Sequence, residues 1–262
     1  MNTFRQYLEL KNYHKNTINN LLKIIIEYLN YNGKPQDYLG YLAQRSNKQY
    51  PEKKLSSGTL NNHIYGLKVY FDYLETTQNK NIPLKLLNYK ITLKTINVLT
   101  IEEIKLLFSV AKNSRERAVL ACLYHLGLRI SEAAFLLVED IDFKENLVLI
   151  RKSKTGRQRQ VPLSEKATEI LTAYIQTRPD KGTTLLQGVQ GNLTADGIAQ
   201  ILRSIVKKSG LTKKVNPHLL RHSIATHLLQ SGMELEKVSL FLGHQSIEST
   251  QRYTHITNDY EL

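Results

Sequence analysis

The 262 residues are 41% hydrophobic and 23% charged, close to the averages of globular proteins, and this composition excludes a wholly disordered chain. A single cysteine, Cys122, excludes an intramolecular disulfide and a cysteine-based metal site, and no run approaches the roughly 18 apolar residues that a membrane span requires. The net charge of +13 is typical of a protein that binds a polyanion, with nucleic acid as the leading candidate and simple solubility as the alternative.

Length and charge distribution together indicate two domains. Domains most often have about 100 to 150 residues, so a chain of this length is expected to contain two. Residues 1–90 hold 13 Lys or Arg and 6 Asp or Glu, a net charge of +7 that exceeds half of the total. Charged residues interrupt the first apolar stretches, so we expect no export signal, a cytoplasmic location and no membrane partner.

Helical periodicity dominates the first 88 residues. Apolar residues recur at helical spacing and predict one buried stripe, made of Ile18, Leu21, Leu22, Ile25, Ile26 and Leu29. Gly33 and Pro35 are expected to end this helix. Two more helices are predicted over residues 36–43 and 59–76, the second with Ser57 as its cap. Residues 1–88 therefore form a small helical bundle in which Tyr65, Tyr70, Phe71 and Tyr73 are expected in the core rather than on a base-stacking surface.

A linker and a second domain follow. Residues 89–98 lose helical periodicity and alternate β-branched with polar side chains, which predicts an extended linker. Thr100 and Glu103 have the spacing of a capping box, and apolar residues follow at helical intervals, so the second domain is predicted over residues 99–262. Another helix is predicted over residues 115–126, with Gly127 as the left-handed residue that ends it. Arg129 lies just beyond that stop.

Two short β-like runs lie at residues 148–150 and 160–163. Turn-forming residues between them predict a hairpin whose basic tip includes Lys154. Further helices are predicted from a Ser164 cap to about Arg178 and over residues 194–209. The fold class is therefore mainly α, with a small antiparallel β-sheet in the second domain.

Reactive side chains are densest near the C-terminal end. Asn216 can act as an N-cap and Pro217 fits the first helical position, which places His218 and Arg221 one turn apart on one helix face. His218 and His222 also have the spacing of two metal ligands. A metal site is disfavoured because no Glu follows His218, as a zincin pattern requires, and because Arg221 would place a fixed positive charge beside the cation.

The next helix is predicted over residues 235–242 and ends at Gly243, which leaves His244 in a loop. Ser246 is expected to cap a final helix from which Tyr253 projects. Each of these residues also has a purely structural explanation, since most helical arginines are solvated or ion-paired and most tyrosines pack in a core. Only their joint occurrence is informative.

Together these segments resemble the tyrosine recombinase (phage integrase) family, close to its Xer-like members. The resemblance rests on HLLRHSIATHLLQSG, LFLGHQS and STQRYTHI, and extends to LGLRISEAAFLL and SKTGRQRQVPL. It spans the second domain, whereas the first matches only in size, helicity and position. It implies a SAM-like core-binding domain over residues 1–88 and a recombinase catalytic domain over residues 99–262.

The resemblance also implies a catalytic site. Its members would be the phosphate-clamping Arg129 and Arg221, the hairpin residue Lys154, the histidines His218 and His244, and the nucleophile Tyr253. Glu132 would support Arg129 rather than react, and Lys152 is the neighbouring rival of Lys154.

The chemistry explains these residue types. Two guanidinium groups, permanently charged with pKa values above about 12, can hold the non-bridging phosphate oxygens bidentately, so neither a metal nor another cofactor is expected. A phenol with an ordinary pKa near about 10 needs cationic surroundings to react, and a lysine can protonate the departing 5′ oxygen. A 3′-phosphotyrosine conserves the phosphodiester energy, which favours reversible cutting and joining over hydrolysis.

The predicted function is therefore site-specific DNA recombination or integration. The alternatives are a catalytically inactive DNA-binding homologue and a type IB-like topoisomerase. The implied partner is double-stranded DNA, bound by a homotetramer on two DNA sites, with an accessory recombinase or DNA-bending protein left open. Only nine residues follow Tyr253, which leaves open how protomers would join through a donated C-terminal element.

Overall fold

The computed structural model describes residues 1–46, 54–79, 88–90, 98–151, 158–179, 182–188 and 191–243. The chain divides into two compact units, Met1–Lys94 and Thr95–Leu262, and each has its own hydrophobic core. Most of the predicted linker lies outside the described residues, so its extended form stays a prediction. No helix in the described ranges is both long and apolar enough to cross a membrane.

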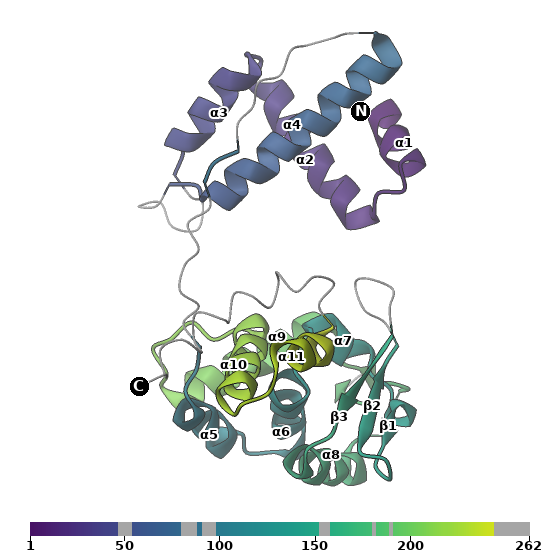
Figure 1. The fold of residues 1–262 in the computed structure, drawn as a ribbon, viewed down its shortest axis with the longest axis vertical. Helices are drawn as coiled ribbons and strands as arrows, with labels where there is room; N and C mark the ends of the chain where they lie inside the picture. Colours follow the sequence, from purple (N-terminus) through teal and green to yellow (C-terminus); the bar gives the residue numbers. More distant parts are fainter. Residues whose placement is uncertain are drawn as a thin grey trace. The chain divides into compact units, whose positions relative to one another are not determined.

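The first unit is a bundle of helices (Figure 1). Its elements are α1 (Asn2–Leu10), α2 (Lys15–Tyr31), α3 (Pro35–Gln44) and α4 (Ser57–Gln78). Sequence reasoning missed α1 and misplaced two helix starts. Pro35 begins α3 at a position where no amide hydrogen is needed, and Ser56 rather than Ser57 caps α4 by accepting from the Thr59 amide.

The buried stripe of α2 is rotated relative to the prediction. Ile26 and Leu29 are exposed, whereas Ile24 is buried. Helix α4 packs closely against α2 at Ile24, because a Cβ on Gly66 would lie only 2.8 Å from Cγ2 of Ile24. The aromatic prediction is correct for Phe71 and Tyr73, which are buried, and wrong for Tyr65, which is exposed.

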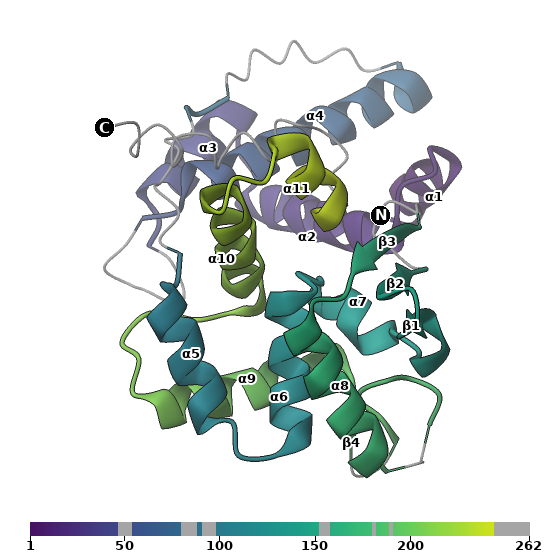
Figure 2. The ribbon, with the colours of Figure 1, turned by 60° about the horizontal axis from the view of Figure 1, so that its bottom comes forward.

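The second unit is mostly helical and carries a small antiparallel sheet (Figures 1 and 2). Its helices are α5 (Ile101–Val110), α6 (Ser114–Leu120), the π-helix η1 (Ala121–His125), α7 (Ile130–Phe135), the 3₁₀-helix η2 (Val138–Asp140), α8 (Glu165–Thr177), α9 (Ala195–Ser209), α10 (Pro217–Gln230) and α11 (Leu235–Leu242). The main sheet has the order β1 (Ile141–Asp142), β2 (Leu147–Ile150), β3 (Arg159–Pro162), and β4 (Gln187–Gly188) pairs with β5 (Gly191–Asn192). The predicted fold class is confirmed.

Local end signals place several of these helices. The capping box of Thr100 and Glu103 is formed at the start of α5, and the Asn216 side chain accepts from the Leu219 amide at the start of α10. Within the hairpin, Ile150 of β2 pairs with Arg159 of β3, so each strand begins one residue earlier than predicted. The predicted hairpin tip, residues 152–157, lies outside the described residues.

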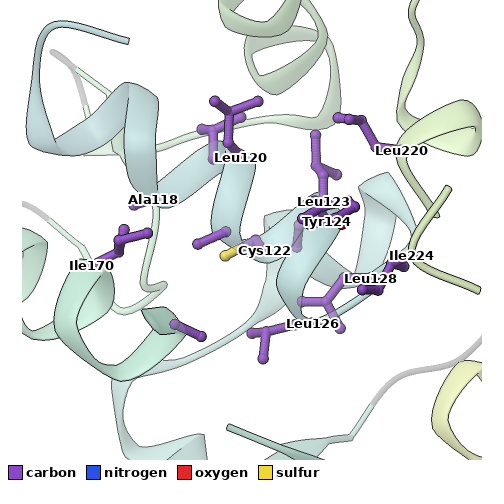
Figure 3. Packing of buried hydrophobic residues seen from close by; sticks show 14 of the residues in the cluster. Ala118, Leu120, Cys122, Leu123, Tyr124, Leu126, Leu128, Ile170, Leu220 and Ile224 are labelled. Atoms are coloured by element: carbon purple, nitrogen blue, oxygen red, sulfur yellow. The ribbon is translucent and has the colours of Figure 1, made fainter. Parts of the chain in front are cut away.

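The helix predicted over residues 115–126 is two elements. An α-helix runs to Leu120, and the next five residues form the π-helix η1, in which the Leu126 amide donates to the Ala121 carbonyl at 3.0 Å. Figure 3 shows this segment in the centre of the core, with Ile170 of α8 and Ile224 of α10 nearby. Burial raises the pKa of the Cys122 thiol to about 12, so this cysteine packs as a small apolar group.

The chain leaves η1 through Gly127, which has a φ of +55°. A Cβ there would lie 2.8 Å from Cε1 of Phe241 and 3.3 Å from Cδ2 of Leu242. Gly127 therefore serves both the left-handed turn and the close approach of α11.

We expect Gly127→Ala to destabilise the second unit by about 2–4 kcal/mol, because the substitution adds left-handed strain and overpacking. Hydrogen exchange of the amides of α6 and η1 would measure the effect. Gly210→Ala is the matched control, since its φ is +69° but no atom lies within 4 Å of an added Cβ, and it should cost only about 1–2 kcal/mol. Equal effects of the two substitutions would contradict the packing argument.

Candidate active site

Arg129 is the N-cap residue of α7, directly after the turn at Gly127. Its backbone amide donates to Oε2 of Glu132 at 2.9 Å, and its Nη1 donates to Oε1 of the same carboxylate at 2.8 Å. Because Glu132 occupies the third helical position, one carboxylate caps the helix and orients the guanidinium. The expected support of Arg129 by Glu132 is thus present.

Glu132 is buried and is held by a second arginine. Arg159 of β3 donates from Nη1 to Oε1 at 2.9 Å and from Nη2 to Oε2 at 2.8 Å, which is a bidentate pair. Burial by itself raises the pKa of the Glu132 carboxyl, but the hydrogen bonds and charge of Arg159 and the contacts of Arg129 outweigh it, so the pKa lies below its ordinary value. Glu132 is therefore a carboxylate at neutral pH.

Arg221 of α10 completes the arrangement. Its side chain is buried, its Nη1 donates to the Gly127 carbonyl at 2.5 Å, and its Nη2 donates to the Leu242 carbonyl. Nη1 also lies 3.8 Å from Oε2 of Glu132. His218, one turn earlier on α10, is exposed, so the two residues share a helix but differ in burial.

The C-terminal end of α11 faces all three arginines. Its last carbonyls, at Phe241, Leu242 and Gly243, each accept a hydrogen bond from a different arginine, namely Arg159, Arg221 and Arg129. Helix α11 packs against α10 and β3 (Figure 2). Carbonyls at a helix end lack intrahelical partners and carry the negative end of the helix dipole, so guanidinium groups stabilise them. Gly243 then ends the helix with a φ of +63°.

The described part of the chain thus brings together two of the predicted site residues, Arg129 and Arg221, and places His218 at the start of α10. The other predicted site residues lie outside the described residues: Lys154, His244 and Tyr253, together with the rival Lys152. Among the described residues, no group of three or more His, Cys, Asp or Glu side chains could hold a metal ion.

Sequence reasoning missed Arg159. A usable signal was present, because strand alternation places Arg159 on the same face as Val161, which is buried. An arginine on the core side of a strand requires a buried acceptor, and a carboxylate is the natural partner.

Comparison with known proteins identifies the family. Residues 97–259 match the phage integrase family. Tyrosine recombinase XerA of Pyrococcus horikoshii is 33% identical over 263 residues, covering 98% of this chain and 89% of the relative. Tyrosine recombinase XerC of Oceanobacillus iheyensis is 33% identical over 287 residues, covering 99% and 92%.

Solved structures give the same fold. A crystal structure of XerA recombinase matches with a TM-score of 0.58 and 25% identity over 99% of this chain and 95% of the other. The XerH site-specific recombinase, in a post-cleavage complex with a palindromic difH substrate, matches with a TM-score of 0.75 and 23% identity over 92% and 77%. By its matching domain and by its similarity to Xer relatives along nearly its whole length, this chain belongs to the phage integrase family of tyrosine recombinases.

Proposed function

We propose that the chain is a site-specific DNA recombinase that cuts and rejoins strands through a covalent 3′-phosphotyrosine intermediate. Family membership and relatives named tyrosine recombinases support this function. The structural observation that carries it is the meeting of Arg129 and Arg221 around Glu132 and the end of α11. These contacts favour an enzyme over an inactive DNA-binding homologue, because they hold the guanidinium groups of Arg129 and Arg221 close to the same carboxylate.

In the proposed reaction, Arg129 and Arg221 bind the non-bridging oxygens of the scissile phosphate. The Tyr253 oxygen attacks phosphorus and gives its proton to His218, while the bond from phosphorus to the 5′ oxygen breaks. Lys154 gives a proton to that departing oxygen, and His218 and His244 complete the site. Because the phosphotyrosine keeps the energy of the phosphodiester bond, the 5′ hydroxyl of another strand can reverse the same steps.

The proposed partner is double-stranded DNA. The basic first unit, residues 1–88, would act as the core-binding domain. The linker at residues 89–98 would join it to the catalytic domain of residues 99–262. Both domains would contact DNA mainly through phosphates. Structural relatives support this partner, since one is the XerH recombinase bound to difH and another a lambda integrase dimer bound to a COC′ core site. A homotetramer on two DNA sites, with or without an accessory recombinase or DNA-bending protein, is the proposed assembly.

Trapping the intermediate tests this function. Nicked duplexes that tile the DNA beside the gene would be incubated with the whole chain, because loss of a short nicked fragment prevents religation. We expect a denaturation-resistant protein–DNA adduct on duplexes with paired inverted half-sites, and peptide mapping should place it on Tyr253. No adduct on any duplex would overturn the proposal, and relaxation of any plasmid without recombinants would favour a topoisomerase.

A further inference from the structure

We infer that Arg159 is a positioning residue of this recombinase: it holds the Glu132 carboxylate, so that the charge of Arg129 remains available for the scissile phosphate. The inference rests on the proposed function and adds a residue to it. Arg159 would not touch DNA and would act only through Glu132.

The contacts of Arg159 are directed into the protein. All three of its guanidinium nitrogens are used there, since Nη1 and Nη2 bind Glu132 and Nε donates to the Phe241 carbonyl at 3.1 Å. Its side chain is 9% exposed, whereas that of Arg129 is 22% exposed. Arg159 therefore makes the bidentate contact with the carboxylate, and Arg129 is the more exposed of the two arginines that hydrogen-bond to Glu132.

Charge balance gives the reason for a third arginine. The three guanidinium groups and the Glu132 carboxylate leave a net charge of +2 in this cluster. A phosphodiester carries one negative charge and gains a second as the tyrosine oxygen attacks, so the cluster matches the transition state. Without Arg159 the net charge would be +1, and Arg129 would have to neutralise Glu132.

Geometry explains why an arginine is needed at this position. The bidentate contact fixes both carboxylate oxygens, and the remaining Nε reaches the end of α11. A lysine carries the same charge but has a single ammonium group and no planar fork, so it cannot make these three contacts in the same geometry. Arg159 therefore ties β3 to α7 and to the last turn of α11.

A single-turnover cleavage assay tests the inference, with the duplex on which the wild-type chain forms its adduct as the probe. Arg159→Lys should lower the cleavage rate about 10-fold and change the dissociation constant for DNA less than about 3-fold. Arg151→Lys is the matched control, because Arg151 directly follows β2, the strand paired with β3, and donates to Glu139 and Asp140 rather than to Glu132, so this variant should keep the wild-type rate.

A double-mutant comparison isolates the path through Glu132. Arg159→Gln alone leaves a buried carboxylate without its main partner and can unfold the unit, so the substitution is made in a Glu132→Gln background, where that charge is absent. There it should change the cleavage rate less than about 3-fold. A larger slowing would overturn the inference, as would a wild-type rate for Arg159→Lys. If the wild-type chain forms no adduct at all, it is the proposed function that fails.

Discussion

Tyr253→Phe is expected to abolish the covalent protein–DNA adduct, with a loss of about 10⁴-fold or more in cleavage rate. The substitution removes the oxygen that is proposed to form the bond to phosphorus and leaves an aromatic ring of nearly the same size. DNA affinity should remain within about 3-fold of wild type, because no positive charge is lost and phosphate contacts dominate binding. Denaturing electrophoresis of the nicked-duplex reaction measures the adduct, and a binding titration measures the affinity.

Tyr260→Phe is the matched control for this prediction. It removes the same hydroxyl group seven residues farther along the chain, as the sequence shows. The control variant should form the adduct at the wild-type rate. An adduct that persists in Tyr253→Phe, or one that maps to Tyr260, would contradict the assignment of the nucleophile and with it the motif on which that assignment depends.

Features with local causes could be predicted from the sequence. Thr100 with Glu103 and Asn216 with Pro217 start helices because their side chains and backbone satisfy nearby amide groups. Gly127 and Gly243 end helical segments because glycine, which has no Cβ, adopts the left-handed conformation without steric strain. These signals place Arg129 after a turn and Arg221 on a helix without any knowledge of tertiary contacts.

Features that depend on packing between distant segments could not be predicted in this way. The π-helix η1 has an ordinary helical pattern in sequence, and its altered hydrogen bonding is seen only within the core of the second unit. The burial of Ile24 depends on how closely α4 approaches α2. The pairing of Arg159 with Glu132 joins residues 27 positions apart, and no rule of spacing along one element connects them.

The end of α11 shows how such distant pairings organise the candidate site. Three consecutive carbonyls accept from arginines on β3, α10 and the start of α7, so the helix end and the cationic cluster fix each other. The chain continues from Gly243 to His244, and the segment that carries Tyr253 follows. A change in the arginine cluster is therefore expected to affect the position of the last turn of α11.

Arg221→Lys is the second substitution with a large expected effect. We expect the cleavage rate to fall about 10³-fold, equivalent to about 4 kcal/mol of transition-state stabilisation. The guanidinium of Arg221 is fixed by the Gly127 and Leu242 carbonyls while it faces Glu132 at 3.8 Å. A lysine cannot hold two carbonyls and a phosphate oxygen with the geometry of a planar fork, although it keeps the positive charge.

The charge-conserving change separates fork geometry from electrostatic attraction. DNA affinity should fall less than about 3-fold, since the net charge is unchanged and long-range attraction to phosphate is preserved. Arg178→Lys is the control. Arg178 also donates from Nη1 to a carbonyl, that of Thr184 at 2.8 Å, but it lies at the end of α8 and does not contact Glu132 in the bonds given above. The cleavage rate of this variant should stay at the wild-type value. If Arg221→Lys cleaved as fast as wild type, a point charge would suffice at this position, and the proposed clamping of the phosphate by two guanidinium forks would be wrong.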